Sequence, residues 1–180
     1  MKIFFRVLLP ILISALGTKT VCAQKKLKDV PLLTISDFRA PVPRNARFPI
    51  YFKYRIYYKI DTVIEKSNNK YQVFVKTKIE PRPEESYWDT ERVHMKDVSQ
   101  MLMHEQGHFY LAYICGSNIE KTMSAFNFTV NWKEEVRKKF FELLSSERES
   151  NTRYDEETAH GLRLKQQTKW NKWMQEELGE

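Results

Sequence analysis

Two stretches in the first half of the chain have the composition of β-strands. Residues 50–60 (IYFKYRIYYKI) and 71–79 (YQVFVKTKI) are rich in aromatic and β-branched side chains. Residues 67–69 (SNN) between them are typical of a turn. We therefore expect an antiparallel hairpin, which Pro81 and Pro83 should end because proline cannot donate a hydrogen bond to a strand ladder.

Helical periodicity replaces this pattern in the second half of the chain. Residues 96–115 carry apolar side chains at helical spacing, and Gly116 is the expected end of that helix. Asn131 and Glu134 have the spacing of a capping box, which predicts the start of a second helix. A third helix is expected over residues 162–178. The apolar faces of the second and third helices would be Val136, Phe140, Leu143 and Leu144, and Trp170, Trp173, Met174 and Leu178.

The remaining pattern lies before the hairpin and completes the predicted fold. Residues 31–38 (PLLTISDF) are a candidate first strand, and the prolines of residues 40–49 indicate a loop. Strands thus come first and helices follow. This order predicts an α+β fold, in which a small N-terminal antiparallel sheet packs against a C-terminal helical half.

The first residues have the composition of a secretory signal peptide. A basic start precedes an apolar run at residues 7–17, and small residues at 21–23 suit cleavage before Gln24. An uncleaved membrane anchor is the alternative, but the run is shorter than the roughly 20 residues that span a bilayer. We therefore expect residues 1–23 to be removed, which leaves residues 24–180 as a single domain that is periplasmic or secreted.

Charge and cysteine content narrow the range of partners. Removal of residues 1–23 lowers the formal charge from +7 to +4, because three basic residues and no acidic ones are lost. The remaining charges of both signs are interspersed, so we expect no nucleic-acid partner. Cys115 is then the one cysteine left, which excludes an internal disulfide. No other apolar segment approaches bilayer thickness, so we expect no stable membrane span after cleavage.

The motif H-E-x-x-H occurs at residues 104–108, within the first predicted helix. Residues four apart lie on one face of a helix, so His104 and His108 can converge on one Zn²⁺ with bonds of about 2.0–2.1 Å. Glu105 lies about 100° around the helix from His104, where it reaches a water molecule rather than the metal. Zinc lowers the pKa of bound water toward about 7. We therefore predict Glu105 as the general base of a hydrolase.

A catalytic zinc site needs a third protein ligand and one open position. His94 is a poor candidate because it would lie about 15 Å from His104 along the helix axis. His160 lies between two predicted helices, where a loop can present it to a distant helix. Glu134 or Glu135, supplied by the second helix, is the alternative. The residues alone leave this choice open.

Three groups of residues resemble the bacterial family of predicted secreted zinc-dependent proteases that is catalogued as domain of unknown function 922. The resemblance implies a zincin-like fold around the helix with the H-E-x-x-H motif, and it implies His160 as the third zinc ligand. It also covers most of the chain that remains after signal cleavage. The matching residues are Leu33-Thr34 with Asp37-Phe38, residues 102–109 (LMHEQGHF), and a closing group of Tyr154-Asp155, Thr158, His160-Gly161, Gln167 and Trp170.

Within such a site, two further side chains have expected roles. Tyr154 can donate a hydrogen bond to the oxyanion of the tetrahedral intermediate, and Asp155 can accept the second N–H of a zinc-bound histidine. The expected function is therefore that of an exported zinc metallopeptidase acting on a peptide, protein or cell-wall peptide substrate. The alternatives are a non-catalytic exported binding protein with a structural zinc site, and a binding protein that has lost its metal.

Overall fold

The structure is a computed structural model and describes residues 25–179. The signal peptide expected at residues 1–23 lies outside the described residues. Four short 3₁₀ helices connect the main elements within this range: Leu27–Asp29, Ile35–Asp37, Pro83–Glu85 and Met95–Asp97. The main elements are β1 (Ile50–Tyr51), β2 (Tyr54–Lys66), β3 (Lys70–Pro81), β4 (Tyr87–Trp88), α1 (Val98–Ala125), α2 (Trp132–Thr158) and α3 (Leu164–Leu178).

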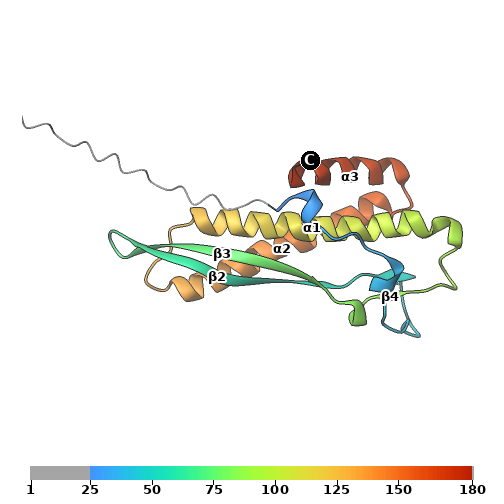
Figure 1. Cartoon of the computed structure of the whole chain (residues 1–180), viewed down its shortest axis with the longest axis horizontal. Coiled ribbons are helices and arrows are strands. Elements are labelled where there is room, and N and C mark those ends of the chain that lie inside the picture. The colour runs from blue at the N-terminus through green and yellow to red at the C-terminus, as the bar shows by residue number, and fades with distance from the viewer. Residues whose placement is uncertain (1–24, 180) are drawn as a thin grey trace, which may run out of the picture.

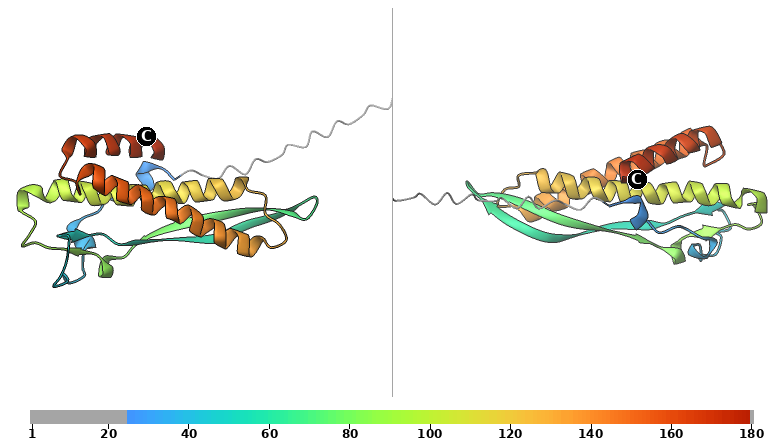
Figure 2. Two further views of the ribbon diagram at one scale, coloured as in Figure 1. Left: turned by 180° about the vertical axis from the view of Figure 1, so that it is seen from behind. Right: turned by 45° about the horizontal axis from the view of Figure 1, so that its top comes forward.

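Helix α1 is the central element of the fold. It contacts β3, α2 and α3, with the β2–β3 hairpin on one side and α3 on the other (Figure 1). Helix α2 crosses α1 at an angle and runs from beside the hairpin to the turn before α3 (Figure 2). The arrangement confirms an α+β fold with a small N-terminal antiparallel sheet and a helical second half. Among the described residues, no helix has the length and hydropathy needed to cross a membrane.

The predicted hairpin is confirmed. Strands β2 and β3 pair antiparallel from Tyr54 opposite Pro81 to Lys66 opposite Lys70. Asn68 and Asn69 form the turn with φ of 61° and 54°, a left-handed conformation that asparagine tolerates better than most residues. The single strand expected over residues 50–60 is divided, however.

Side-chain hydrogen bonds explain why that stretch does not form one strand. The two residues of β1 pair with β4, not with the hairpin. Between β1 and β2, the backbone N–H of Lys53 donates to Ser86 Oγ at 2.9 Å instead of to another strand. The backbone oxygen of Lys53 accepts from the N–H of Arg82 at 2.8 Å. The extended chain therefore changes partner between residues 51 and 54.

The expected end of the first helix at Gly116 is wrong, because α1 continues to Ala125. Gly116 lies where α1 packs against β3. A Cβ atom at this position would lie 2.8 Å from Thr77 Oγ1 and 3.0 Å from Ile79 Cδ1. Glu120, one turn further along α1, accepts hydrogen bonds of 2.7 Å from both the backbone N–H and the hydroxyl of Thr77. The glycine thus marks a close contact between helix and strand.

The expected strand over residues 31–38 is also wrong. The side-chain amide of Gln106 in α1 accepts from the backbone N–H of Leu33 at 2.8 Å and donates to the carbonyl of Pro31 at 3.2 Å. These bonds take the place of a strand partner. Asp37 then accepts from the backbone N–H of Thr34 at 2.7 Å, which stabilises the 3₁₀ turn at Ile35–Asp37.

The two later helices form where expected, with corrections at their ends. Asn131 precedes α2 but makes no side-chain cap, and Glu134 pairs with Arg137, so the capping box is absent. Helix α3 begins at Leu164 rather than Leu162. The expected inward faces are otherwise buried or partly buried, except that Trp173 is exposed.

Replacement of Gly116 by alanine tests the close contact between α1 and β3. Alanine is the better helix former by about 1 kcal/mol, but overpacking against Thr77 and Ile79 costs about 1–3 kcal/mol. We expect Gly116→Ala to lower the free energy of unfolding, measured by urea denaturation. Ser99→Ala, at an exposed position of the same helix, should leave it unchanged or slightly higher. A stabilised Gly116→Ala protein would contradict this packing.

Candidate metal centre and its cavity

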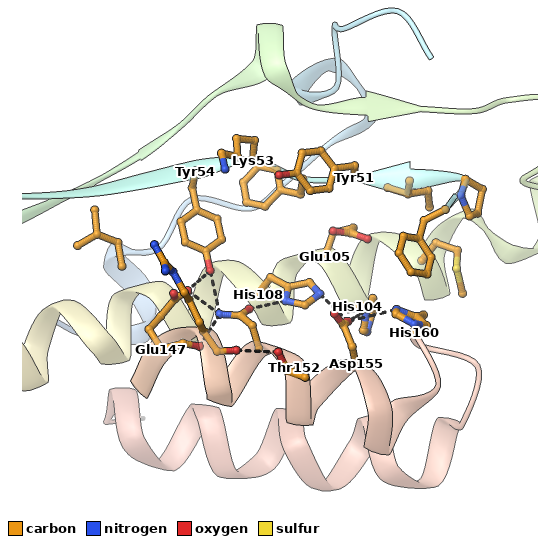
Figure 3. A pocket seen from close by; sticks show the side chains of 18 of the residues that line it. Tyr51, Lys53, Tyr54, His104, Glu105, His108, Glu147, Thr152, Asp155 and His160 are labelled. Atoms are coloured by element: carbon orange, nitrogen blue, oxygen red, sulfur yellow. Dashed lines mark hydrogen bonds and ion pairs between the residues drawn. The ribbon is translucent and has the colours of Figure 1, made fainter. Parts of the chain in front are cut away.

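The ring nitrogens of two histidines converge on one carboxylate oxygen. His104 and His108 lie one turn apart on α1, and their Nε2 atoms lie 3.1 Å and 3.0 Å from Oδ1 of Asp155. Asp155 comes from the last turns of α2, where that helix crosses α1. His104 is buried and Asp155 is partly buried. Figure 3 shows the three side chains meeting between the two helices.

The second ring nitrogen of His108 faces the side-chain oxygen of Asn151. The distance from Nδ1 to Oδ1 is 2.5 Å. The orientation of this amide is fixed by its other contacts, because Nδ2 of Asn151 donates to the Tyr54 hydroxyl at 3.1 Å and to the backbone oxygen of Glu147 at 2.9 Å. An amide oxygen only accepts, so Nδ1 of His108 carries a proton.

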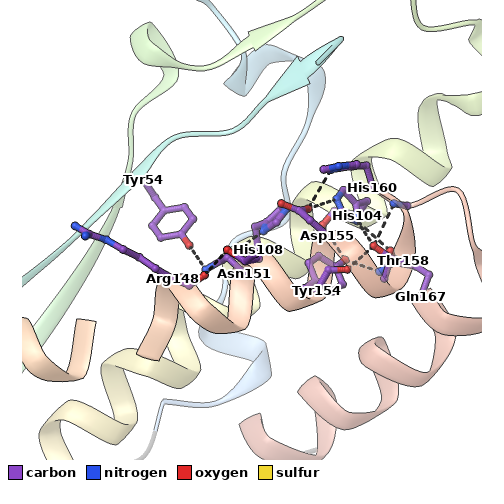
Figure 4. A network of polar contacts seen from close by, with 12 residues as sticks. Tyr54, His104, His108, Arg148, Asn151, Tyr154, Asp155, Thr158, His160 and Gln167 are labelled. Atoms are coloured by element: carbon purple, nitrogen blue, oxygen red, sulfur yellow. Dashed lines mark hydrogen bonds and ion pairs between the residues drawn. The ribbon is translucent and has the colours of Figure 1, made fainter. Parts of the chain in front are cut away.

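His104 is held in the same way from α3. Its Nδ1 lies 3.1 Å from Oε1 of Gln167. The Gln167 amide nitrogen donates to the hydroxyl of Tyr154 at 2.5 Å and to Oδ1 of Asn171 at 2.8 Å, which fixes its oxygen toward the histidine. Figure 4 shows these contacts as one network around the two histidines. Both histidines therefore have Nδ1 protonated.

A neutral imidazole with a proton on Nδ1 carries a lone pair on Nε2. Two such lone pairs and a carboxylate oxygen cannot share a space of about 3 Å without a cation between them, because all three are acceptors. His104, His108 and Asp155 are thus a candidate metal-binding triad, whose ligand atoms all lie within 4.8 Å of one another. Their chemistry, two imidazoles and one carboxylate, suits zinc.

The pKa values of the metal-free groups reflect this convergence. Burial by itself lowers the pKa of His108, but its hydrogen bond to Asp155 and the charge of Glu105 outweigh burial and raise the pKa to about 9. Burial opposes ionisation of Asp155, yet hydrogen bonds from His104 and His108 hold its pKa well below the usual value. In the absence of metal, a proton thus occupies the space between the ring nitrogens and the carboxylate at neutral pH.

Glu105 lies beside the triad in a cavity of about 670 Å³. One wall of the cavity is the extended chain of residues 48–56, and α1 and α2 form the others. Figure 3 shows Glu105 between the histidines and the strand that carries Tyr51. Its side chain is buried, and burial raises the pKa of its carboxyl. Such a carboxylate can accept and return a proton near neutral pH more readily than an exposed one.

The turn after α2 places His160 at the edge of the same site. Nδ1 of His160 lies 3.4 Å from Oδ1 of Asp155, and its ring packs 4.5 Å from that of Phe48. Ala159, His160 and Gly161 have φ values of 48°, 53° and 84°. A left-handed conformation costs a non-glycine residue roughly 1–2 kcal/mol. Strained backbone of this kind is concentrated at active sites and ligand-binding segments.

Tyr154 packs against His104 and does not line the cavity. Its ring stacks on the His104 ring at 4.7 Å, and its hydroxyl donates to the backbone oxygen of His104 at 3.0 Å. Tyr154 is fully buried, and burial raises the pKa of its hydroxyl well above the usual value. The oxyanion role expected from the sequence has no support in this position, because the one hydroxyl proton already has an acceptor.

Two glycines make room for this arrangement. A Cβ atom on Gly107 would clash with the hydroxyl oxygen of Tyr154. A Cβ atom on Gly161 would lie 2.8 Å from Cβ of His104. Thr158 also contributes, since its hydroxyl lies 3.5 Å from Nδ1 of His104. Most of the closing group named in the sequence therefore surrounds His104, and Trp170 packs behind it on the Tyr154 ring at 5.4 Å.

The structure brings together some predicted site residues and separates others. Glu134 and Glu135 begin α2, about 30 Å along that helix axis from Asp155. Glu135 instead accepts from the backbone N–H of Thr129 at 2.9 Å, so neither glutamate is a third ligand. His94 precedes α1 and does not line the cavity.

Two supporting residues, Asn151 and Gln167, were missed as histidine partners by the sequence analysis. The spacing of Asn151 and Asp155 is the signal that was available: four residues apart, they share one helix face. The sequence did not reveal it because the segment before His160 was expected between two helices, whereas residues 154–158 form the end of α2. Asp155 was expected to accept the second N–H of a histidine, a role that the two amides fill.

Comparison with known proteins identifies the family. The family model described as a bacterial protein of unknown function (DUF922) matches residues 34–161, more than half of the chain, so the protein belongs to this family. The match includes the three triad residues and His160 but ends before Gln167. No curated protein and no solved structure matches the chain.

Replacement of Gly107 tests the contact between α1 and Tyr154. We expect Gly107→Ala to lower the free energy of unfolding by about 1–3 kcal/mol, because the added methyl group meets the phenol. In a Tyr154→Phe background the cost should be smaller, since the closest clashing atom has gone. Denaturation of the four proteins gives the coupling free energy. Equal costs in both backgrounds would mean that another contact requires the glycine.

Proposed function

We propose that the protein is an exported, zinc-dependent metallohydrolase that acts as a peptidase with Glu105 as its general base. The observation that supports this proposal is the convergence of two imidazole nitrogens on one carboxylate oxygen, beside a buried glutamate, in an open cavity. The arrangement joins the helix with the H-E-x-x-H motif to the end of α2. In this proposal the fold is zincin-like in its motif helix and in the strand wall beside it.

The donor set fits zinc in number, chemistry and spacing. Zinc bonds of about 2.0–2.1 Å in a tetrahedral arrangement place ligand atoms about 3.3 Å apart, close to the 3.0–3.1 Å between the histidine nitrogens and Asp155. We assign Asp155 as the third ligand, and three protein ligands leave one position open, as catalytic zinc sites do. Asn151 and Gln167 hold the histidines in the required tautomer.

The residues around the metal position have separate roles in the proposed hydrolysis. Zinc, when bound, lowers the pKa of water and polarises a carbonyl group. Glu105 accepts the proton of the attacking water and returns it to the leaving amine, which its raised pKa favours. Tyr154 positions His104 through ring stacking and the hydrogen bond to its carbonyl. His160 lies beside Asp155 and can donate a hydrogen bond to that carboxylate.

The shape of the cavity favours a peptide over a small molecule. Its strand wall, residues 48–56, is extended, and a peptide substrate can lie along such a wall in the same conformation. Apolar and aromatic side chains, including Phe48, Met101 and Leu144, line it beside the polar centre. A protein or cell-wall peptide outside the cytoplasm is the proposed substrate, on the strength of the signal peptide expected at residues 1–23.

A non-catalytic protein with a structural zinc site is the second candidate. Structural sites take four protein ligands, often cysteines. Cys115 is buried in the core around Val73 and Ile119 and does not line the cavity. Within the described residues, the candidate triad has three members. The three-ligand site therefore favours catalysis.

Substitution of Glu105 separates binding from chemistry. The purified protein should bind about one equivalent of zinc. Glu105→Gln should keep the zinc and lose about 10²–10⁴-fold in the rate of hydrolysis of a peptide library, because the general base is lost. Glu149→Gln, at an exposed position on α2, serves as the control. Unchanged hydrolysis by Glu105→Gln would remove Glu105 as the base, and absence of zinc binding would reject the proposal.

The identity of the third ligand is open to direct measurement. We expect Asp155→Ala to weaken zinc binding by more than about 100-fold, since loss of a supporting residue alone costs about 10–100-fold. His160→Ala should weaken it by less than about 10-fold if His160 only contacts Asp155. Competition with a chromophoric chelator measures both affinities. The reverse order would establish His160 as the ligand, as the family resemblance implies.

A further inference from the structure

The cavity carries two basic side chains away from the metal-binding triad, one on each wall. Lys53 lies between β1 and β2 in the strand wall, and Arg148 lies on α2. Figure 3 shows Lys53 beside Tyr54, and Figure 4 shows Arg148 extending from α2 toward the strand that carries Tyr54. Among the described residues, neither cation forms an ion pair with a carboxylate. Both are thus available to a ligand.

The one acidic side chain at this end of the cavity is already engaged. The carboxylate of Glu147 accepts a hydrogen bond from the Tyr54 hydroxyl and another, of 2.5 Å, from the side-chain amide of Asn151. The two cations exceed this single acid by one charge. The other end holds Glu105 and Asp155, with the position for a divalent cation between the histidines. The charges of the cavity are therefore separated along its length.

The spacing between the two ends is set by α2. Arg148, Thr152 and Asp155 all line the cavity and are spaced along one face of that helix. Seven residues separate Arg148 from Asp155, which corresponds to about 10 Å along the axis. An extended peptide rises about 3.3 Å per residue. The basic end therefore lies about three peptide residues from the metal-binding residues.

We propose that Lys53 and Arg148 bind a carboxylate group of the substrate and make the protein selective for acidic peptides. Arginine binds carboxylates with two parallel hydrogen bonds, and lysine adds a mobile positive charge from the opposite wall. The bound carboxylate belongs to an acidic side chain, because acidic and neutral peptides carry the same C-terminal carboxylate. The position of cleavage rests on the proposed function, whereas the preference for acidic peptides does not.

Peptide binding by the zinc-loaded Glu105→Gln protein tests this selectivity without cleavage. The probes are a fluorescein-labelled heptapeptide of alternating Ala and Glu, and the same peptide with Gln in place of Glu. By fluorescence anisotropy at low salt, the acidic peptide should bind at least about tenfold more tightly, and salt should reduce the difference. Equal affinity for the two peptides would overturn the proposal.

Charge-removing variants locate the effect within the cavity. Lys53→Gln and Arg148→Gln should each weaken binding of the acidic peptide about fivefold and leave the Gln peptide unaffected. Lys59→Gln on β2 and Lys138→Gln on α2 remove exposed cations that lie outside the cavity, and they should leave the affinity for both peptides unchanged. Equal losses in all four variants would show a general charge effect and reject the site.

Two further experiments identify the source of the bound carboxylate and show whether the selectivity or the proposed function fails. Amidation of the C-terminus of both peptides should leave the preference unchanged, and an equal loss of affinity for both would instead assign the site to the terminal carboxylate and reject the selectivity. Hydrolysis of neutral and acidic peptides at equal rates by the wild-type protein would reject the selectivity and keep the proposed function. Selective binding of acidic peptides by a protein that hydrolyses none would reject the proposed function and keep the selectivity.

Discussion

The fold depends on a set of acceptors that meet in a buried place between α1 and α2. His104, His108 and Asp155 direct two nitrogens and one oxygen at a common point. Buried polar groups are costly unless each has a partner. The outer nitrogens have theirs in Asn151 and Gln167, and the inner ones require a cation. The crossing of the two helices is therefore fixed by polar contacts as well as by apolar packing.

The C-terminal third of the chain is arranged around one imidazole. Tyr154 stacks on the His104 ring, Gly161 leaves no room for a side chain beside its Cβ, and Gln167 lies within hydrogen-bond distance of its Nδ1. These contacts come from the end of α2, from the turn and from α3, so three separate segments restrict one side chain. A ligand held in this way loses little conformational freedom when it binds a metal. The left-handed turn at Ala159 and His160 is the conformational cost of that restriction.

The sequence predicted the elements whose signals are local and missed those that depend on distant contacts. The hairpin followed from composition and turn residues, and the start of α2 followed from the spacing of Asn131 and Glu134, although the capping box that this spacing predicted is absent. Gly116 was taken as a helix end because a glycine in a helix looks the same whether it ends the helix or faces a neighbouring strand. Residues 31–38 look like a strand, but their hydrogen-bond partner is the side chain of Gln106, which only the tertiary structure reveals.

In the candidate site, too, only the features with local signals were predictable. The pairing of His104 with His108 is a property of one helix and was predictable from their spacing. The acid that meets them comes from another helix, and its identity depends on how the two helices cross. The family resemblance implied His160 as the third ligand, and the residues alone left Glu134 or Glu135 as the alternative. Asp155 was expected only to accept a histidine N–H, because the sequence does not show how the two helices cross. The structure places the carboxylate between the imidazoles and the histidine at the rim.

The charge balance of the cavity changes with the cation that lies between the histidines and Asp155. A proton on His108, whose pKa is about 9, offsets the charge of Asp155 in the metal-free protein. A divalent cation in the same place would offset both Asp155 and Glu105 and would leave Glu105 able to exchange protons with water. In the proposed function, a metal ion would take the place of this proton between His104, His108 and Asp155. The basic pair at the other end of the cavity lies outside this balance, which leaves Lys53 and Arg148 free to act on the substrate.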